Sequence, residues 1–246
     1  MGKLFKRLKS YAIYRANLKE LVRQEATART KFAFGKPYPC LSDRYQSSGS
    51  ARGHYFHQDL LVARRIFANH PASHVDVGSR IDGFVAHVAS FRTIRVLDIR
   101  AQDNVIPNVV FEQCDIMGEV PDYLVDSTDS LSCLHALEHF GLGRYGDPIR
   151  YDGYLGGFEN LCRILKPGGR FYFSTPIGPQ RIEFDAHRVF SVGYLLEMIE
   201  PKYDVVRFSY VDDLGGLHED VGLGVDAVRD NFGCYYGCGI FELIKR

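Results

Sequence analysis

The sequence lacks several features that would assign it to a membrane or to a disulfide-stapled class of protein. No run approaches the roughly 18 apolar residues that a membrane-spanning helix needs. The N-terminus carries positive charges without the apolar stretch of a secretory signal, and Lys6 stands where a myristoylation motif requires Ser or Thr. Six cysteines are scattered without a CxxC pair. These absences predict a cytoplasmic protein with reduced thiols and no structural zinc.

The chain has no net charge at pH 7, because its 30 Lys and Arg residues balance its 30 Asp and Glu residues. This balance disfavours a protein that binds nucleic acid through its overall charge. The charge is nevertheless uneven, since residues 1–31 carry nine Lys or Arg against Glu20 and Glu25. Residues 3–30 are predicted to form a basic helix. Its apolar positions would pack on the domain or on a second subunit, as in a homodimer, or the helix would lie on an anionic membrane surface.

The chain of 246 residues is long enough for one large α/β domain with an appendage. Residues 35–53 are rich in Gly, Pro and Ser and predict a loop, and residues 57–69 have helical spacing up to Pro71. We therefore expect a basic helical extension and lid segment over 1–70, and a folded domain over 71–246.

Short strands and helices alternate through the rest of the chain. Expected strands cover 74–77, 95–99, 109–114, 130–135, 170–174, 203–210 and 238–245, and expected helices cover 84–91, 153–165 and 191–199. This alternation predicts an α/β, Rossmann-like fold with a mostly parallel, seven-stranded sheet and helices on both faces.

The first chemical motif lies where the first strand ends. An apolar strand runs into Asp76, and Gly78 then allows a tight turn and a close approach to a ligand. Asp98 ends the next strand, where a carboxylate accepts both hydroxyls of a ribose in nucleoside-binding Rossmann units. Each feature alone is common, since an Asp after a strand is often a plain helix cap.

Three further strings follow in order along the chain. Asp115 and Ile116 end the third strand, the fourth strand ends in HALEHF at 135–140, and LKPGGR at 165–170 precedes the fifth. In this order the motifs resemble those of the class I S-adenosylmethionine-dependent methyltransferases. The strings DVGSRIDGF, HALEHF and AHRVF are also similar to a poorly characterised subgroup of that family associated with surface-polysaccharide biosynthesis.

The resemblance implies S-adenosylmethionine as the cofactor and assigns residues to its parts. Asp76, Gly78 and Ser79 would line the methionine portion, and Asp98 and Ile99 would hold the ribose. Asp115 and Ile116 would frame the adenine, with His135 near the sulfonium. The sequence departs from the family's Gly-rich loop at Arg80 and Asp82, where a bulky Arg would either narrow the pocket or turn outward.

Methyl transfer needs alignment, and a base if the acceptor is a hydroxyl. The candidate bases are Glu138, His139 and His187, the first two of which share the spacing i, i+3, i+4 with His135. Some relatives hold a divalent metal with such a set. The alternative is a satisfied hydrogen-bonding pair at a strand end, which we favour because the set lacks the carboxylates that hard cations prefer.

The acceptor side is expected in the insert after the fourth strand and just after the fifth. Candidate substrate-binding residues are Tyr145, Arg150, Tyr151, Asp152 and Arg188. They suit a small polar substrate, such as a sugar or a phosphorylated compound, and each is about as consistent with ordinary loop packing. His54, Tyr55 and His57 lie where a lid would cover the cofactor.

Two functions of different classes follow. The first is an O- or N-methyltransferase acting on a sugar, a nucleotide-sugar or another glycan precursor. The second is a cofactor-binding or assembly protein that kept the fold without turnover, a reading that Arg80 and Asp82 favour. A nicotinamide-dependent sugar enzyme is disfavoured, because no Tyr has a Lys four residues further on and the full Gly-x-Gly-x-x-Gly loop is missing.

Overall fold

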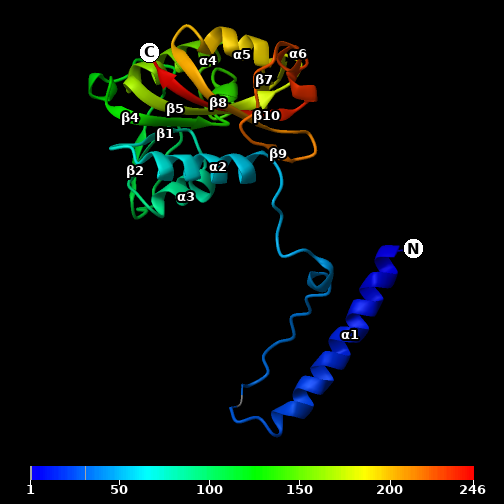
Figure 1. The fold of residues 1–246 in the computed structure, drawn as a ribbon. Helices are drawn as coiled ribbons and strands as arrows, with labels where there is room; N and C mark the ends of the chain where they lie inside the picture. Colours follow the sequence, from blue (N-terminus) through cyan, green and yellow to red (C-terminus); the bar gives the residue numbers. More distant parts are fainter. Residues whose placement is uncertain (1, 31) are drawn as a thin grey trace. The chain divides into compact units, whose positions relative to one another are not determined.

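The computed structural model describes residues 2–30 and 32–246, which divide into two compact units, Met1–Ser50 and Ala51–Arg246. The first unit contains helix α1 (Gly2–Glu25), drawn in blue in Figure 1, and a later 3-10 turn at Asp43–Tyr45. α1 ends before the predicted residue 30, because Thr27 and Ala28 donate to carbonyls three residues back and tighten the last turn.

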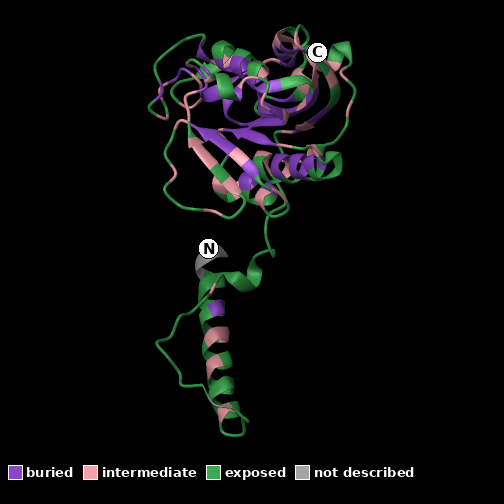
Figure 2. Cartoon of the chain, turned by 90° about the vertical axis from the view of Figure 1, so that its left-hand side faces the viewer, coloured by how far each residue is buried: buried purple, intermediate pink, exposed green. Residues whose placement is uncertain are grey.

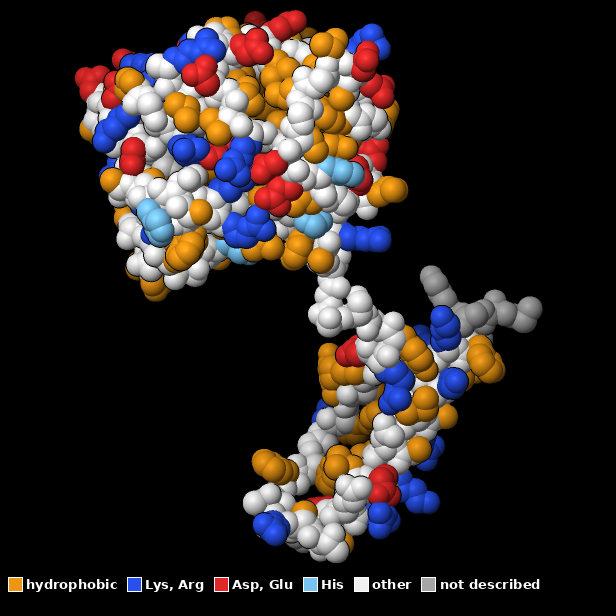
Figure 3. Space-filling view, viewed as in Figure 1, with side chains coloured by type: hydrophobic (Ala, Val, Ile, Leu, Met, Phe, Trp, Pro, Cys, Tyr) orange, Lys and Arg blue, Asp and Glu red, His pale blue; other side chains and the backbone are white. Residues whose placement is uncertain are grey.

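Helix α1 and the segment around residues 40–44 together line a small hollow. The hollow is lined by Ser10, Tyr14, Asn17, Leu18, Leu21, Cys40, Leu41 and Arg44. Apolar and basic side chains are intermixed on the rest of this unit, as Figure 3 shows, with Phe5 and Leu8 both largely exposed. Among the helices that the structure describes, none is both long enough and apolar enough to cross a bilayer.

The second unit is built on one eight-stranded sheet with the order β3-β2-β1-β4-β5-β10-β8-β9. Its strands are β1 (Val75–Val77), β2 (Ile94–Asp98), β3 (Val109–Gln113), β4 (Thr128–Leu134), β5 (Leu165–Ile177), β8 (Tyr203–Val211), β9 (Leu217–His218) and β10 (Gly237–Lys245). Strands β1 to β5 are parallel, and β10 runs antiparallel between β5 and β8. The prediction of a mostly parallel α/β sheet is therefore confirmed.

The predicted count of seven strands is wrong by one. The extra strand, β9, has two residues, and it pairs with the end of β8 through Tyr210↔His218 and Val211↔Leu217. A tight turn makes this pairing, because the Asp212 side chain accepts hydrogen bonds from the backbone N–H groups of Leu214 and Gly216. Two residues are too few to show the alternating pattern of a strand in the sequence.

Helices cover both faces of the sheet, as predicted (Figure 1). Helices α2 (His54–Asn69) and α3 (Ala86–Ala89) lie on one face, and α4 (Gly153–Ile164) and α5 (Val192–Ile199) lie on the other. The alternation of side chains along β5 explains how one strand serves both. Phe171 and Phe173 join the core under α4 and α5, and Tyr172 between them joins the core under α2. Figure 2 shows the resulting layer of buried strands.

Two local departures from the predicted elements matter for the site. The predicted helix over 84–91 is a π-helical turn (Ile81–Val85) followed by the short α3, with Gly83 in a non-helical conformation. A small antiparallel pair, β6 (Arg181–Glu183) and β7 (His187–Val189), follows β5 and was not predicted.

Helix α2 belongs to the compact unit Ala51–Arg246, whereas the sequence analysis grouped it with the basic segment over 1–70. The physical reason is burial. Leu61, Val62 and Ile66 are at most 2% exposed and pack in the same core as strands β2, β5 and β10. Removing this helix would strip one face of the sheet of its cover.

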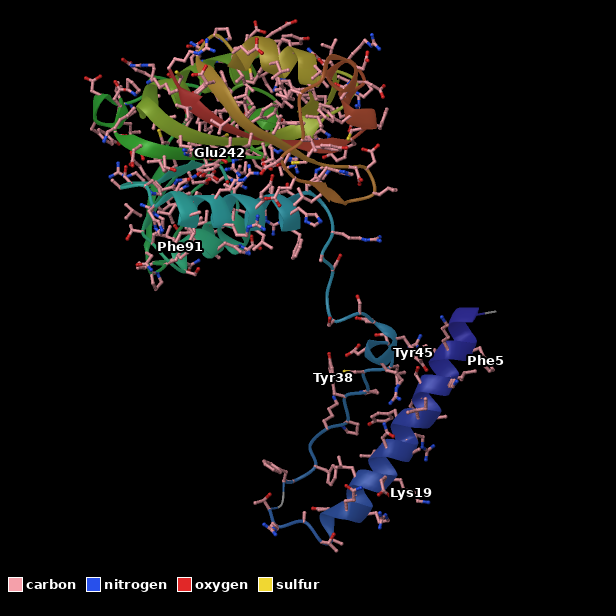
Figure 4. The ribbon with its side chains drawn as sticks, viewed as in Figure 1. Phe5, Lys19, Tyr38, Tyr45, Phe91 and Glu242 are labelled. Carbon is pink, nitrogen blue, oxygen red and sulfur yellow. The ribbon has the colours of Figure 1, made fainter. Side chains whose placement is uncertain are left out.

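Ion pairs of the buried Arg65 also connect α2 to β10 and to the segment after β9. The Arg65 guanidinium lies 2.6 Å from the Asp220 carboxylate and 3.6 Å from that of Glu242, which is 2% exposed and is labelled in Figure 4. Arg170 and Arg207 lie on the same Glu242 carboxylate. Such a network is sensitive to the loss of one partner, because a desolvated charge is left without compensation.

We expect Arg65→Met to lower the free energy of unfolding by about 3 kcal/mol in urea denaturation, since it uncouples α2 from Asp220 and Glu242. Arg229→Met is the matched control, because Arg229 and its partner Asp226 are 76% and 87% exposed. The control should change stability by less than about 0.5 kcal/mol. Equal losses in the two variants would contradict a stabilising role for the buried network.

Candidate functional site

The second unit contains a cavity of about 320 Å³ at the carboxyl ends of β1, β2, β3 and β4. The strand order reverses between β1 and β4, which is where open α/β sheets leave a crevice for ligands. The lining residues are Tyr55, Gln58, Asp59, Val77, Gly78, Ser79, Arg80, Phe84, Leu97, Asp98, Ile99, Arg100, Cys114, Asp115, Ile116, Met117, Leu134, His135, Ala136, His139, Phe140, Arg144, Tyr145 and Asp147. Topology thus gathers side chains that lie far apart in the chain.

The turn after β1 forms the floor of the cavity. Gly78 has φ +76°, and a Cβ at this position would lie 2.7 Å from the Cβ of Ala136 after β4. Only glycine allows the two turns to approach this closely. Ser79 is held in place because its N–H and hydroxyl both donate to Asp76, at 3.0 and 2.8 Å.

Asp76 itself lies beneath the floor rather than in the wall. Its carboxylate is fully buried and accepts hydrogen bonds from Ser79 and from the Ser132 hydroxyl. Burial raises the pKa of Asp76 to about 7, against the lowering effect of these hydrogen bonds. Asp76 therefore stabilises the turn after β1 through these hydrogen bonds. A ligand in the cavity would contact Gly78 and Ser79 rather than Asp76.

Asp98 lines the cavity at the end of β2 and is held by Arg100. The guanidinium of Arg100 donates to the two carboxylate oxygens of Asp98 at 2.9 and 2.6 Å, and its backbone N–H adds a third bond at 2.8 Å. The same guanidinium lies 4.5 Å from the centre of the Tyr145 ring. Arg100 thereby links the end of β2 to the insert after β4, a link that the sequence analysis missed.

Asp115 and Ile116 line the cavity just after β3. Asp115 accepts a hydrogen bond from the N–H of Met117, and the side chain of Asn160 on α4 donates to the carbonyls of Ile116 and Gly118 at 2.8 Å. Helix α4 thus fixes the position of this loop.

Three side chains after β4 form a buried chain. His135 donates from Nδ1 to Glu138 at 2.7 Å, and Glu138 lies 3.8 Å from His139 Nε2. Burial raises the pKa of Glu138, but His135, the nearby His139 and a backbone hydrogen bond together outweigh this effect, so the pKa is lowered. Glu138 is 1% exposed and does not line the cavity, whereas both histidines do.

His139 has the features of a neutral base at the cavity wall. Its Nδ1 donates to the carbonyl of Ala186 at 2.7 Å, which fixes the proton on that nitrogen and leaves the lone pair on Nε2. Burial lowers the pKa of His139, although the Glu138 charge opposes this. Its ring meets the Tyr145 ring edge-on at 5.3 Å.

Tyr145 is placed by the loop around Asp147. The Asp147 carboxylate accepts hydrogen bonds from the backbone N–H groups of Gly141, Gly143 and Tyr145, at 2.9 to 3.1 Å. This arrangement closes the loop on itself and turns Tyr145 into the cavity wall beside Arg144.

The other predicted substrate residues lie outside this cavity. Arg188 is 4% exposed and donates to the carbonyls of Phe140 and Tyr151 at 2.7 and 2.8 Å, so it fastens backbone. Tyr151 is 76% exposed, Arg150 reaches only the Met117 carbonyl, and Asp152 precedes α4. Their polar side chains were an ambiguous signal, because loop packing uses the same residue types.

His187 also lies apart from the cavity, on β7. Its Nε2 is 3.2 Å from the Glu183 carboxylate, and its ring lies 5.1 Å from that of Tyr236. The metal-binding alternative built on Glu138, His139 and His187 therefore lacks geometric support. Among residues 2–30 and 32–246, the group of His and Cys side chains close enough to hold an ion is a different one, His54, His135 and Cys238.

Arg80 and Asp82, where the sequence leaves the family pattern, pair with each other. The Arg80 guanidinium donates to the Asp82 carboxylate at 3.0 and 2.7 Å, with 60% and 73% of the two side chains exposed. Of the two outcomes expected for Arg80, the structure shows the outward one. Arg80 stands at the rim of the cavity, beside the Tyr55 ring.

Helix α2 contributes residues to the cavity lining that the order of the sequence motifs did not predict. Tyr55, Gln58 and Asp59 occupy positions i, i+3 and i+4 and face the cavity together. The helical spacing of these polar residues was visible in the sequence, but it does not reveal which part of the sheet the helix covers.

Comparisons of the sequence with known proteins give a partial match. A family model described as "Caenorhabditis protein of unknown function, DUF268" matches residues 109–214, which is less than half of the chain. A comparison with curated proteins gives no match.

Similar solved structures include the 1,6-didemethyltoxoflavin-N1-methyltransferase of Burkholderia thailandensis, with bound 1,6-didemethyltoxoflavin and S-adenosylhomocysteine. It is 15% identical with a TM-score of 0.55, over 95% of this chain and 89% of that one. The second unit has the class I methyltransferase fold. The [4+2]-cyclase SpnF shares this methyltransferase fold at 14% identity and a TM-score of 0.54, over 80% of this chain and 85% of its own. The YcgJ protein of Bacillus subtilis also shares the fold. It is 16% identical with a TM-score of 0.52, over 77% of this chain and 98% of its own.

We expect Gly78→Ala to destabilise the protein by more than Gly168→Ala, as measured by urea denaturation. Both glycines have positive φ, +76° and +73°, so the backbone strain is matched. Only the new Cβ at position 78 meets a neighbour, at 2.7 Å from Ala136, whereas position 168 is open. The difference should be about 1–3 kcal/mol, and equal effects would show that the two turns can separate freely.

Proposed function

We propose that this protein is an S-adenosylmethionine-dependent methyltransferase that modifies a small polar acceptor. The observation that supports this most is the convergence at one cavity of Gly78, Asp98, Asp115 and His135, each from the end of a different parallel strand. These are the positions that the resemblance assigns to the methionine, ribose, adenine and sulfonium portions of the cofactor. The cavity volume of about 320 Å³ falls within the usual range for small-molecule sites, roughly 300–1,000 Å³.

S-adenosylmethionine, when bound, supplies a sulfonium methyl group with a good leaving group. The protein then has to align an acceptor and take up its proton. His139 suits the second task, because its Nε2 carries the lone pair and its pKa is lowered. We propose that His139 Nε2 accepts the proton that an acceptor hydroxyl or amine loses. Glu138, buried behind both histidines, would stabilise the charge that His139 gains.

The acceptor would enter beside Tyr145 and Arg144, which line the cavity next to His139. A guanidinium and a tyrosine at this place suit an acceptor with hydroxyl or phosphate groups. We propose a sugar, a nucleotide-sugar or another glycan precursor, a class that rests on the resemblance to the polysaccharide-associated subgroup.

A second candidate is a binding or assembly protein without turnover. The observation in its favour is the ion pair between Asp98 and Arg100, which already occupies both oxygens of the predicted ribose acceptor. The similarity to a [4+2]-cyclase adds that this fold is not confined to proteins named as methyltransferases.

We expect the wild-type protein to bind S-adenosylmethionine and S-adenosylhomocysteine in calorimetry, and Asp98→Asn to weaken both by tenfold or more. The reason is that the amide loses one acceptor of the ribose hydroxyls. Asp226→Asn, an exposed carboxylate on α6 (Val225–Arg229), is the matched control and should bind as wild type does. No binding of either nucleoside to the wild type would end the methyltransferase proposal.

His139→Ala should lower turnover by roughly 10²- to 10⁴-fold while leaving S-adenosylhomocysteine affinity within a few fold. The measurement is S-adenosylhomocysteine formation with a panel of nucleotide-sugars and sugar phosphates. Wild-type activity should fall as the pH drops through the lowered pKa of His139, because the base becomes protonated. Intact turnover in the variant would remove His139 from the mechanism, and nucleoside binding without turnover on any acceptor would favour the binding protein.

A further inference from the structure

Helix α2 brings an acid to the methionine side of the cavity that none of the sequence motifs contains. Asp59 follows Gln58 on the buried face of the helix and is 6% exposed. Its Oδ1 accepts a hydrogen bond from the Gln58 amide at 3.1 Å. Its Oδ2 lies against the π-helical turn Ile81–Val85, since a Cβ on Gly83 would meet that atom at 2.8 Å. Asp59 lines the same cavity as Gly78 and Ser79.

Two other acids of this cavity have both carboxylate oxygens engaged. Asp98 is paired with the Arg100 guanidinium, and Asp147 accepts from three N–H groups of its own loop. Asp115 accepts on Oδ1 from the Met117 N–H beside the predicted adenine position, whereas Asp59 accepts on Oδ1 from Gln58. Within residues 2–30 and 32–246, Asp59 forms no ion pair. Of the positive groups whose charge acts on it, Arg80 and His135 pair with Asp82 and Glu138 instead. Burial raises the pKa of Asp59, which records the cost of keeping this charge out of water.

A carboxylate in this position gains most from a cationic ligand group. Desolvated charges are stable when an opposite charge reaches them, and a charged hydrogen bond is stronger than a neutral one. The proposed cofactor carries a cationic amino group at the end remote from its adenine. If Asp98 and Asp115 held the nucleoside, the residues of the turn after β1 and of α2 that line the cavity would be left to hold the amino-acid end.

We propose that Asp59 is the binding subsite for the cationic amino group of the methionine portion of S-adenosylmethionine. This inference rests on the proposed function and deepens it. It also gives the methionine end an acid in place of Asp76, whose oxygens serve Ser79 and Ser132. Asp59 thus acts as a specificity residue, because it distinguishes a complete cofactor from a nucleoside that lacks the amino acid.

The experiment compares two ligands by calorimetry on the full-length chain. S-adenosylhomocysteine carries the amino group, and 5′-methylthioadenosine keeps the nucleoside and the sulfur but lacks the amino acid. Asp59→Asn should weaken S-adenosylhomocysteine by tenfold or more and change methylthioadenosine by less than twofold. Asp226→Asn, the same substitution on an exposed pair, should change neither ligand.

Each alternative gives a different result. An equal loss for both ligands would show that Asp59 supports the cavity as a whole, and an unchanged affinity would show that it does not meet the ligand. A larger loss for S-adenosylmethionine than for S-adenosylhomocysteine would place Asp59 at the sulfonium instead. Each of these overturns the proposal while leaving the proposed function intact. If the wild type binds none of the three nucleosides, the proposed function fails and this subsite fails with it.

Discussion

The close approach of two turns, at Gly78 after β1 and at Ala136 after β4, is the constraint on which the candidate site depends. The strand order reverses at this place, so the turns diverge above it and leave the crevice open. A side chain on residue 78 would push the turns apart and move Ser79 and His135 with them. The buried Asp76 carboxylate serves the same constraint from below, because it ties the first turn to Ser132 on β4.

The covering helix α2 then turns an open crevice into a cavity. Its apolar residues join the core under the sheet, and its buried Arg65 pairs with Asp220 and Glu242. Tyr55, Gln58 and Asp59 near its N-terminal end line the cavity. One helix therefore contributes both to the core and to the wall of the cavity, through different residues.

Much of this arrangement could be predicted from the sequence. The order of short strands and helices predicted the parallel sheet with helices on both faces, and the acid or glycine at each strand end predicted part of the cavity wall. Such residues are recognisable because the carboxyl ends of parallel strands meet at one edge. Contacts between distant segments could not be predicted in this way. The pairing of Arg100 with Asp98 and the burial of Arg188 depend on side-chain positions that no local pattern specifies.

The partner surface of α2 could not be predicted either, for a related reason. Helical spacing identified α2 but not its partner surface, so it was grouped with the basic segment that precedes it. Its apolar face belongs to the same core as β5 and β10, which lie more than 100 residues further along the chain. The two-residue strand β9 and the β6–β7 pair are similarly defined by partners rather than by their own composition.

Under the proposed function, the ion pair between Asp98 and Arg100 would make nucleoside binding an exchange of partners rather than a simple addition. A ribose that takes the Asp98 oxygens competes with a guanidinium that also rests on the Tyr145 ring. Arrival of a nucleoside would thus loosen one tie between the end of β2 and the loop that borders the acceptor space.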